Sequence, residues 1–383
     1  MTSNYKKLRQ YIQPVNIRNK DLNVEKLLGV SIRKVLMPSI ANTVGTNMKT
    51  YEIIQKNQFA YGPVTSRNGD KISIALLQEF DEAIISQAYV VFEIIDTEIL
   101  NPEYLMMWFR RPEFDRYARF KSHGSARETF DWEELCDTEL PIPSIEKQQE
   151  IVKEYNIVVN RIQLNEKLNQ KLEETAQALY KHWFVDFEFP NLEGKPYKSS
   201  GGKMIFNREL DGEIPVGWGA ATLENLYKFQ YGLGNTNPNN NGQYPIYGAG
   251  GVIGGYDKFN SEDAPVIGHM GAYCGKVVFA FGKHFVTYNG VICKAKSDKL
   301  KWFSYMTLLS KDLMSNTRGS SQPFVSYDML YEIQVIIPKE EIAIKFDSMI
   351  KKLFKGINRS ILENELFAEL KDLLLSKMTK LKA

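Results

Sequence analysis

The feature that most constrains this chain of 383 residues is an internal repeat with a fixed separation of 195 residues. The stretch His123-Gly-Ser-Ala-Arg-Glu-Thr-Phe-Asp-Trp132 matches Arg318-Gly-Ser-Ser-Gln-Pro-Phe-Val-Ser-Tyr327, and the match extends without a gap to Pro143 and Pro338. Each copy has the pattern of a Gly-Ser turn, a short helix and an alternating strand that ends at proline. The repeat therefore predicts two related domains.

The repeat continues into two helical segments, Ile151–Trp183 and Phe346–Met378, whose apolar residues keep the 3.5-residue period of a coiled-coil seam. Buried polar side chains in such a seam usually set its register. Two helices of equal length most simply pair with each other, although each stripe could instead pack on its own globular domain. Both seams carry polar residues at the same two steps, namely Asn165 and Asn169 in the first and Ser360 and Asn364 in the second.

These patterns predict an α+β fold class with an internal pseudo-two-fold repeat. Two mixed α/β domains are expected, separated by two long helices that form an antiparallel coiled coil. The expected boundaries are residues 1–143 for the first domain, 144–189 for the first long helix, 190–213 for a linker, 214–338 for the second domain and 339–383 for the second long helix.

Composition limits the kind of partner and the setting. The chain has 48 Lys+Arg and 46 Asp+Glu, and no segment exceeds the net +3 of residues 339–383, so it is no strongly basic nucleic-acid binder. Its mean hydropathy is −0.32 and it has no apolar run long enough to span a membrane. The polar N-terminus does not resemble a signal peptide. Three scattered cysteines favour a reducing, cytoplasmic compartment over a disulfide framework.

Motifs of catalysis are missing from the sequence. There is no phosphate loop of the Gx4GK[ST] kind, no HExxH pair and no GxSxG elbow. The four histidines also lack the companions that metal-ligand spacing requires. A binding protein is therefore favoured over an enzyme such as a fused methyltransferase or nuclease.

The sequence resembles the specificity (S) subunit of type I restriction–modification systems over essentially its whole length. The resemblance lies in Ala178-Leu-Tyr-Lys-His-Trp-Phe-Val-Asp-Phe-Glu-Phe-Pro190, in Ile214-Pro-Val-Gly-Trp218, in Tyr244-Pro-Ile-Tyr-Gly-Ala-Gly-Gly251 and in the duplicated Gly-Ser turns. It departs from the family because the first domain lacks an Ile-Pro-x-Gly-Trp opening, which leaves that domain's N-terminal boundary less secure.

This resemblance implies two target recognition domains, each followed by a conserved helix, and each reading one half of a split double-stranded DNA target. It implies docking to two modification (methyltransferase) subunits that act on adenines, and to restriction subunits where they are present. No catalytic residue is expected in this chain; S-adenosylmethionine, ATP and Mg are expected only on partner subunits. The alternative is a coiled-coil scaffold without base-specific DNA contact.

The length of the first long helix suggests that the coiled coil fixes the distance between the two domains. Residues 151–183 form 33 residues of helix, or about 50 Å. Pseudo-two-fold protein symmetry usually mirrors a two-part DNA site. The coiled coil is therefore predicted to set the length of the non-specific spacer between the two half-sites.

Candidate DNA contacts in the first domain are basic and amide side chains near turn formers, which can pair with phosphates or base edges. For any single surface Arg or Lys, a solvated charge is the alternative, and a purely structural turn is the alternative for the Gly-Ser segments. The candidates are Arg33, Lys34, Lys49, Arg67, Asn68, Lys71, Ser125 and Arg127.

In the second domain, an amide-rich loop and a glycine-flanked hairpin supply the candidates. The loop could equally be a flexible connection, and Cys274 is expected to pack rather than to act as a nucleophile. The hairpin, residues 268–276, is expected to correspond to the stretch around residues 67–71. The candidates are Asn235, Asn237, Tyr247, His269, Tyr273, Lys276, Arg318, Ser320 and Gln322.

An aromatic run after the first long helix is too apolar to lie in water. Trp183, Phe184 and Phe187 are candidates for docking a methyltransferase subunit, because exposed aromatic clusters mark protein interfaces. Core packing at the end of the coiled coil is the first explanation for these side chains, and docking is the second.

Overall fold

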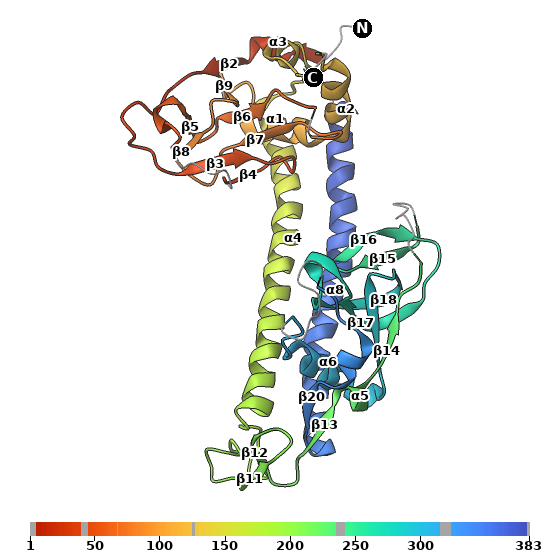
Figure 1. Ribbon diagram of the computed structural model, residues 1–383. Coiled ribbons are helices and arrows are strands. Elements are labelled where there is room, and N and C mark those ends of the chain that lie inside the picture. Colours follow the sequence, from red (N-terminus) through yellow and green to blue (C-terminus); the bar gives the residue numbers. More distant parts are fainter. Residues whose placement is uncertain are drawn as a thin grey trace. The chain divides into compact units, whose positions relative to one another are not determined.

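A computed structural model describes residues 5–39, 45–66, 68–124, 127–234, 242–314 and 323–380, with the side chain of Lys380 excepted. The chain forms two compact units (Figure 1). The first unit combines Met1–Leu164 with Glu363–Ala383, and the second consists of Asn165–Leu362. Each unit thus contains part of both long helices, α4 (Ile145–Tyr180) and α8 (Glu340–Lys377).

In the first unit, described strands form two four-stranded sheets, ordered β2-β9-β6-β7 and β4-β3-β8-β5, and a separate pair β1-β10. The strands are β1 (Tyr5–Lys7), β2 (Ile12–Val15), β3 (Leu27–Val30), β4 (Leu36–Pro38), β5 (Glu52–Gln55), β6 (Phe59–Gly62), β7 (Ser73–Leu76), β8 (Glu82–Ile85), β9 (Val90–Ile94) and β10 (Glu139–Pro141). The shorter helices are η1 (Leu8–Gln10), η2 (Met48–Thr50), α1 (Pro102–Arg110), α2 (Pro112–Lys121), α3 (Trp132–Cys136) and η6 (Met378–Lys380).

In the second unit, the described strands form a six-stranded sheet ordered β14-β19-β17-β18-β15-β16, and the pairs β13-β20 and β11-β12. The strands are β11 (Met204–Asn207), β12 (Gly212–Pro215), β13 (Gly219–Thr222), β14 (Tyr227–Tyr231), β15 (Tyr244–Gly248), β16 (Gly251–Tyr256), β17 (Ser261–Gly268), β18 (Val277–Val286), β19 (Gly290–Ala295) and β20 (Gln334–Ile337). The shorter helices are η3 (Lys181–Val185, a π-helical turn), α5 (Leu223–Leu226), η4 (Gly271–Tyr273), η5 (Asp298–Leu300), α6 (Lys301–Leu309) and α7 (Tyr327–Tyr331).

The predicted repeat of turn, helix and strand is confirmed. Helix α3 and strand β10 of the first unit match α7 and β20 of the second at the predicted separation. Leu135 and Leu330, on these two helices, are both fully buried. The same side chain in the same place of each copy therefore fills the core.

The repeat extends further upstream than the sequence shows. The N–H groups of Leu8 and Leu223 donate to the carbonyl oxygens of Thr138 and Ile333, at 2.9 Å in both copies. Strand β1 pairs with β10 just as β13 pairs with β20, antiparallel in each case. Leu8 and Leu223 are 215 residues apart rather than 195. Loops of different length thus hide the upstream half of the repeat.

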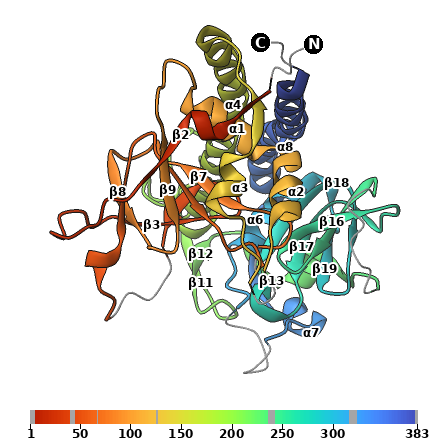
Figure 2. The ribbon, with the colours of Figure 1, turned by 90° about the horizontal axis from the view of Figure 1, so that it is seen from above.

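The two long helices pair antiparallel within each unit, as the seam predicts. In the first unit the start of α4 shares a core with the end of α8, and Asn364 Nδ2 donates to the carbonyl oxygen of Ile162 at 3.4 Å. In the second unit the end of α4 packs on the start of α8, with the rings of Tyr180 and Phe346 5.9 Å apart. The helices run side by side in Figure 1 and Figure 2. All seam residues are buried or half-buried, including Asn165 and Ser360.

The segment predicted as a linker by composition, residues 190–213, contains ordered structure. It includes β11 and the start of β12, which pair antiparallel from Met204 and Pro215 to Asn207 and Gly212. Its Tyr197 ring stacks on Phe189 at 4.6 Å. None of the helices in the described ranges combines the length and the hydropathy needed to cross a bilayer.

Candidate nucleic-acid interface

A backbone junction in the first unit joins the tip of the β6–β7 hairpin to the segment that follows α2. The N–H of Phe130 donates to the carbonyl oxygen of Pro63 at 2.8 Å, and the N–H of Thr65 donates to that of Glu128 at 2.9 Å. Val64 and Thr129 form an isolated antiparallel bridge between these bonds. The junction thus holds the hairpin that carries Asn68 and Lys71 next to the segment that carries Arg127.

The second unit contains the same junction. The N–H of Val325 donates to the carbonyl oxygen of His269 at 3.0 Å, and the N–H of Gly271 donates to that of Pro323 at 3.1 Å. Met270 and Phe324 form the bridge between them. Residues 323–325 follow residues 128–130 by the repeat separation, so the β17–β18 hairpin is the structural counterpart of the β6–β7 hairpin.

In the first unit, Lys71 and Arg127 are exposed at this junction, and Asn68 is half-buried. The Asn68 amide donates to the Val64 carbonyl oxygen at 3.1 Å and to Ser73 Oγ at 3.2 Å. It therefore shapes the hairpin tip, whereas the side chains of Lys71 and Arg127 are exposed to solvent.

Three side chains of α2 that sequence reasoning missed lie at the same place. Lys71 and Asp70 of the hairpin line a shallow hollow together with Arg116, Arg119 and Phe120. The Phe120 ring is 84% exposed, the Arg116 side chain 69%. An exposed aromatic ring beside basic side chains suits stacking or groove contact with nucleic acid. The helical spacing of Arg116 and Phe120, four residues apart on one face, was the available signal.

In the second unit, Tyr273 and Lys276 form one exposed cluster on the hairpin tip. Lys276 Nζ donates to the carbonyl oxygen of Gly250 at 3.0 Å and lies 5.4 Å from the centre of the Tyr273 ring. A side chain at Gly250 would come within 2.8 Å of that ring, so this close approach requires glycine. The β15–β16 turn thus supports the tip of the hairpin.

His269 is held at the base of the hairpin. Its Nδ1 lies 2.7 Å from the carbonyl oxygen of Val325, and its ring lies 4.6 Å from that of Tyr231. Cys274 donates its thiol to the carbonyl oxygen of His269 at 3.5 Å, and burial raises the pKa of Cys274. A buried, protonated thiol packs rather than reacts.

The described flank of the amide-rich loop approaches the same edge of the sheet. The N–H of Tyr288 donates to the carbonyl oxygen of Gly234 at 3.2 Å, and the N–H of His269 donates to that of Asn289 at 2.8 Å. The turn after β18 therefore connects the loop flank to the hairpin. Seven candidates themselves lie outside the described residues: Arg67, Ser125, Asn235, Asn237, Arg318, Ser320 and Gln322.

Two sequence-based candidates are wrong as surface contacts because their side chains are buried. Lys34 is 5% exposed; its ammonium lies 2.8 Å from Asp115 Oδ1 and also donates to the carbonyl oxygen of Phe109. Burial lowers the pKa of Lys34, and Asp115 opposes this shift. Tyr247 is 9% exposed and packs edge-on against the His284 ring at 5.3 Å. Both side chains stabilise the fold.

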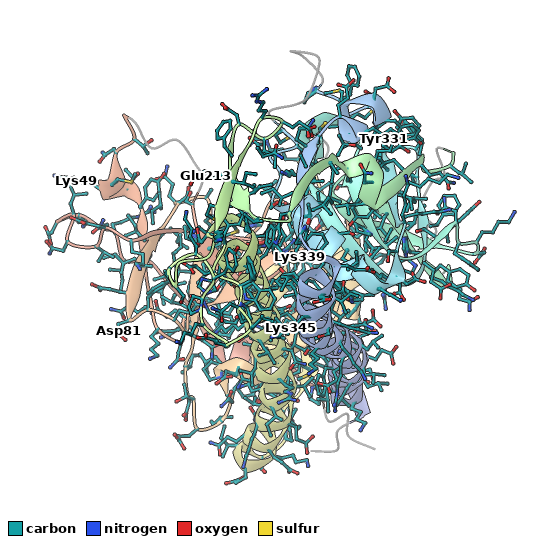
Figure 3. The ribbon with its side chains drawn as sticks, turned by 90° about the horizontal axis from the view of Figure 1, so that it is seen from below. Lys49, Asp81, Glu213, Tyr331, Lys339 and Lys345 are labelled. Carbon is teal, nitrogen blue, oxygen red and sulfur yellow. The ribbon has the colours of Figure 1, made fainter. Side chains whose placement is uncertain are left out.

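The remaining two candidates are exposed but are not brought to the junction by any described contact. Arg33 lies in the β3–β4 turn, where its N–H donates to Ser31 Oγ at 3.1 Å. Lys49 belongs to η2, and Figure 3 shows it at the margin of the unit.

The aromatic run is also wrong as a docking surface. Trp183, Phe184 and Phe187 are 5%, 2% and 8% exposed, because the chain's own core covers them. Phe184 packs against Phe346 at 4.8 Å and Phe187 against Trp218 at 5.7 Å. Core packing, the first explanation given for this run, is confirmed.

Exposed apolar side chains follow the long helices instead. Within the first unit, each exposed residue directly precedes a seam residue on its helix. In an antiparallel pair, residues one step before the seam on both helices lie on the same side. They form the leucine face: Ile157 and Leu164 on α4, and Leu366, Leu370 and Leu373 on α8.

No group of three or more His, Cys, Asp or Glu side chains in the described ranges could hold a metal ion. The fold and the junctions define a class: a duplicated α+β recognition module carried on a pair of long helices. The sequence profile described as "Type I restriction modification DNA specificity domain" matches residues 17–174 and 215–364, and the chain belongs to this family. Members of the family are non-catalytic DNA-recognition subunits of type I restriction–modification systems.

Individual relatives of the chain are also named as specificity subunits. The chain is 26% identical over 310 residues to the type I restriction enzyme MjaIX specificity subunit of Methanocaldococcus jannaschii, covering 74% of this chain and 70% of that one. It is 29% identical over 181 residues to the HindI specificity subunit of Haemophilus influenzae, covering 46% and 38%. The fold resembles the crystal structure of an S subunit from M. genitalium, with a TM-score of 0.55, 16% identity and coverage of 99% and 96%.

Proposed function

We propose that each unit of this chain reads one half of a two-part double-stranded DNA target, with the paired hairpin and post-helix segment as the reading surface. The observation that carries the proposal is the identical junction, formed at Pro63–Thr65 in one unit and at His269–Gly271 in the other. A duplicated protein element usually recognises a duplicated DNA element. The proposed contacts are Lys71, Arg116, Phe120 and Arg127 in the first unit, and His269, Tyr273 and Lys276 in the second.

The near-neutral charge of the chain is compatible with this role. The affinity of proteins for DNA comes largely from phosphate neutralisation by Lys and Arg. With 48 basic and 46 acidic side chains, this chain supplies little of that term itself. We therefore expect weak DNA binding by the isolated chain, and tight, specific binding when modification subunits are present.

The leucine face is the proposed docking surface for the modification subunits. Its five side chains lie on helices and not in the DNA-reading segments, and they are 41% to 65% exposed. Contiguous apolar surface of this kind marks protein interfaces. Two modification subunits and, where present, restriction subunits are proposed to complete the assembly.

We expect the chain to bind no S-adenosylmethionine, ATP or Mg of its own, and to direct adenine methylation by its partners. A cytoplasmic location is proposed because all three cysteines are free and buried. Equilibrium dialysis of the isolated chain with S-adenosylmethionine checks the first expectation.

The test of the proposed function is selection of random double-stranded DNA by the chain assembled with its modification subunit, followed by sequencing. The expected result is enrichment of two short fixed sequences separated by a spacer of constant length and variable composition. Enrichment of no sequence, as a pure scaffold would give, or of one undivided sequence contradicts the proposal.

A further inference from the structure

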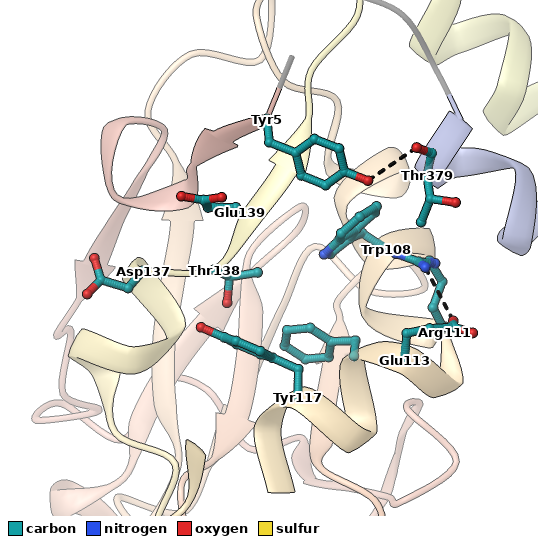
Figure 4. A pocket seen from close by; sticks show the side chains of 10 residues that line it. Tyr5, Trp108, Arg111, Glu113, Tyr117, Asp137, Thr138, Glu139 and Thr379 are labelled. Carbon is teal, nitrogen blue, oxygen red and sulfur yellow. Dashed lines mark hydrogen bonds and ion pairs between the residues drawn. The ribbon is translucent and has the colours of Figure 1, made fainter. Parts of the chain in front are cut away.

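A cavity of about 480 Å³ lies beside η6 in the first unit, and contacts within the chain join its walls (Figure 4). The Tyr5 hydroxyl donates to the carbonyl oxygen of Thr379 at 3.2 Å, and Arg111 Nη2 lies 3.3 Å from Glu113 Oε2. The first of these contacts joins β1 to η6. The second unit, by contrast, has apolar side chains at its reading surface that its core does not cover.

The tip of the β17–β18 hairpin and the β15–β16 turn beside it contain few groups that can pair with DNA. Over residues 248–253 and 268–276 the one charged side chain is that of Lys276. Its Nζ donates to a carbonyl oxygen of the β15–β16 turn at 3.0 Å, and the His269 ring is held at the base of the hairpin. Apart from Lys276 and the Tyr273 hydroxyl, the exposed side chains of this tip are apolar.

Three exposed side chains with large apolar surfaces lie at the tip. Val252 is 59%, Ile253 46% and Tyr273 56% exposed. A side chain at Gly248 would come within 3.3 Å of the Ile253 side chain, so Ile253 lies directly over the turn, as Tyr273 lies over Gly250. Single exposed apolar residues are ordinary, whereas a group of them marks a binding surface. The turn therefore holds an apolar surface in place before any ligand binds.

The chemistry of DNA limits what such a surface can recognise. The tip lies within residues 215–364, the second segment of the chain that belongs to the DNA specificity family. Phosphates and the polar edges of bases require hydrogen-bond donors, acceptors or charges. The apolar group that DNA presents in the major groove is the 5-methyl group of thymine.

We infer that Val252 and Ile253 contact the 5-methyl group of a thymine in the half-site that the second unit reads, with the Tyr273 ring beside them. This inference rests on the proposed function and adds the base feature that the second unit recognises. Burial of one methyl group raises affinity roughly three- to fourfold. The hollow of the first unit differs, because Lys71 and Arg116 give it charged walls.

The test replaces thymine by deoxyuridine, which lacks only the 5-methyl group. The DNA is the two-part target selected by the chain assembled with its modification subunit. Each thymine of the half-sites and of the spacer is replaced singly, and fluorescence anisotropy measures binding by the same complex. At least one replacement in one half-site should weaken binding roughly three- to fourfold, and replacements in the spacer should leave it unchanged.

A double variant of the full chain assigns the effect to the tip. Val252→Ala with Ile253→Ala should bind the thymine and deoxyuridine duplexes equally at the sensitive position. The matched control is Ile205→Ala, which removes an apolar side chain that is 54% exposed on the β11–β12 hairpin, and it should keep the wild-type difference. Thermal melting establishes that each variant folds; Ile253→Ala alone replaces the double variant if that variant does not.

Equal binding of every deoxyuridine duplex by the wild type overturns the inference, while selection of a two-part target leaves the proposed function standing. A methyl effect that the folded double variant retains also overturns it. This includes an equal loss of affinity for both duplexes, as apolar side chains wedged between base steps would give.

Two further outcomes separate the partners. If the double variant no longer binds the modification subunit in titration calorimetry, the tip is a protein contact and the inference is wrong. If the wild-type complex selects no two-part target, the proposed function itself is contradicted and the inference fails with it.

Discussion

The backbone N–H of Val325 donates a hydrogen bond to the carbonyl oxygen of His269, 3.0 Å away, and fixes the base of a hairpin against the segment that precedes α7. The bond from Phe130 to Pro63, at 2.8 Å, does the same in the other unit. Because both bonds are between backbone groups, they survive sequence divergence of the hairpin tips they support. This arrangement lets each tip carry different side chains on one conserved frame.

Phe120 is predicted to contribute to DNA affinity. Its ring is 84% exposed at the end of α2, beside Arg116 and Arg119. Covering such a ring on DNA is worth roughly 1 kcal/mol or more, so Phe120→Ala should weaken specific binding by the assembled complex about five- to tenfold in fluorescence anisotropy. The matched control is Phe206→Ala, which removes a ring that is 58% exposed on the β11–β12 hairpin of the second unit. Equal effects of the two variants argue against a DNA role for Phe120.

Lys34 and Lys71 are predicted to have opposite roles. Lys34 is buried with Asp115, 2.8 Å away, and leaving one member of a buried pair without its partner costs roughly 3–5 kcal/mol. Lys34→Ala should therefore lower the free energy of unfolding of the first unit by about that amount. Lys71 is exposed, so Lys71→Ala should change stability by no more than about 0.5 kcal/mol and should weaken DNA binding. Denaturant unfolding measures the free energy of unfolding of each variant, and fluorescence anisotropy on the same preparations measures DNA binding. A Lys34→Ala variant as stable as the wild type contradicts the burial argument.

His284 is predicted to make the second unit sensitive to acid. Burial lowers the pKa of His284 below its usual 6.5, against the opposing effects of the Gly282 carbonyl and of Asp263 and Glu262. As the pH falls, His284 therefore becomes protonated in the unfolded chain before it does so in the folded protein. The stability contribution is complete above about pH 6.5 and is lost below it, by up to about 1.4 kcal/mol per pH unit.

Thermal melting between pH 7.5 and pH 5.5 checks this dependence. The variant His284→Leu should lose less stability on acidification than the wild type over that range. His123→Leu, which removes an exposed histidine, is the control and should follow the wild type. Identical pH profiles for all three proteins are the contrary result.

The coiled coil is predicted to set the spacer of the DNA target. Seven residues inserted in α4 after Asn165, and seven in α8 before Ser360, add two helical turns to each helix. This is roughly 10 Å, or about 3 base pairs. Methylome sequencing should show a correspondingly longer spacer, whereas the same seven residues inserted between Gly201 and Gly202 should leave it unchanged. An unchanged spacer in the variant with longer helices contradicts the prediction that the coiled coil sets the spacer length.

Much of this fold follows from local pattern. The seam from Ile151 to Trp183 and its repeat are predictable because the two seams are apolar or polar at the same steps, except at Ala176 and its counterpart Lys371. The short helix beginning at Trp132 likewise recurs at Tyr327. The repeat upstream of residue 123 was not predictable, since insertions change the separation from 195 to 215 residues by Leu8 and Leu223. Only the shared hydrogen bond to residues 138 and 333 reveals it.

The candidate site was predictable in part. Glycine and turn residues marked the hairpins, and the junctions bring their described residues together. The burial of Lys34 and Tyr247 could not be predicted from the sequence, because it depends on tertiary contacts. Lys34 pairs with Asp115, which is 81 residues away, and Tyr247 packs on His284. Phe184 was misplaced for the same reason, because its covering residue Phe346 belongs to the other long helix.

The central claim is that each junction reads its own half of the DNA target. The most direct measurement is methylome sequencing of cells that express either the wild-type chain or a chain with Asn68 and Lys71 both replaced by alanine, each with the modification subunit. The account predicts that the methylated motif of the variant is altered or relaxed in one half-site only, with the other half-site and the spacer unchanged. A change in both half-sites, or none in either, would contradict it.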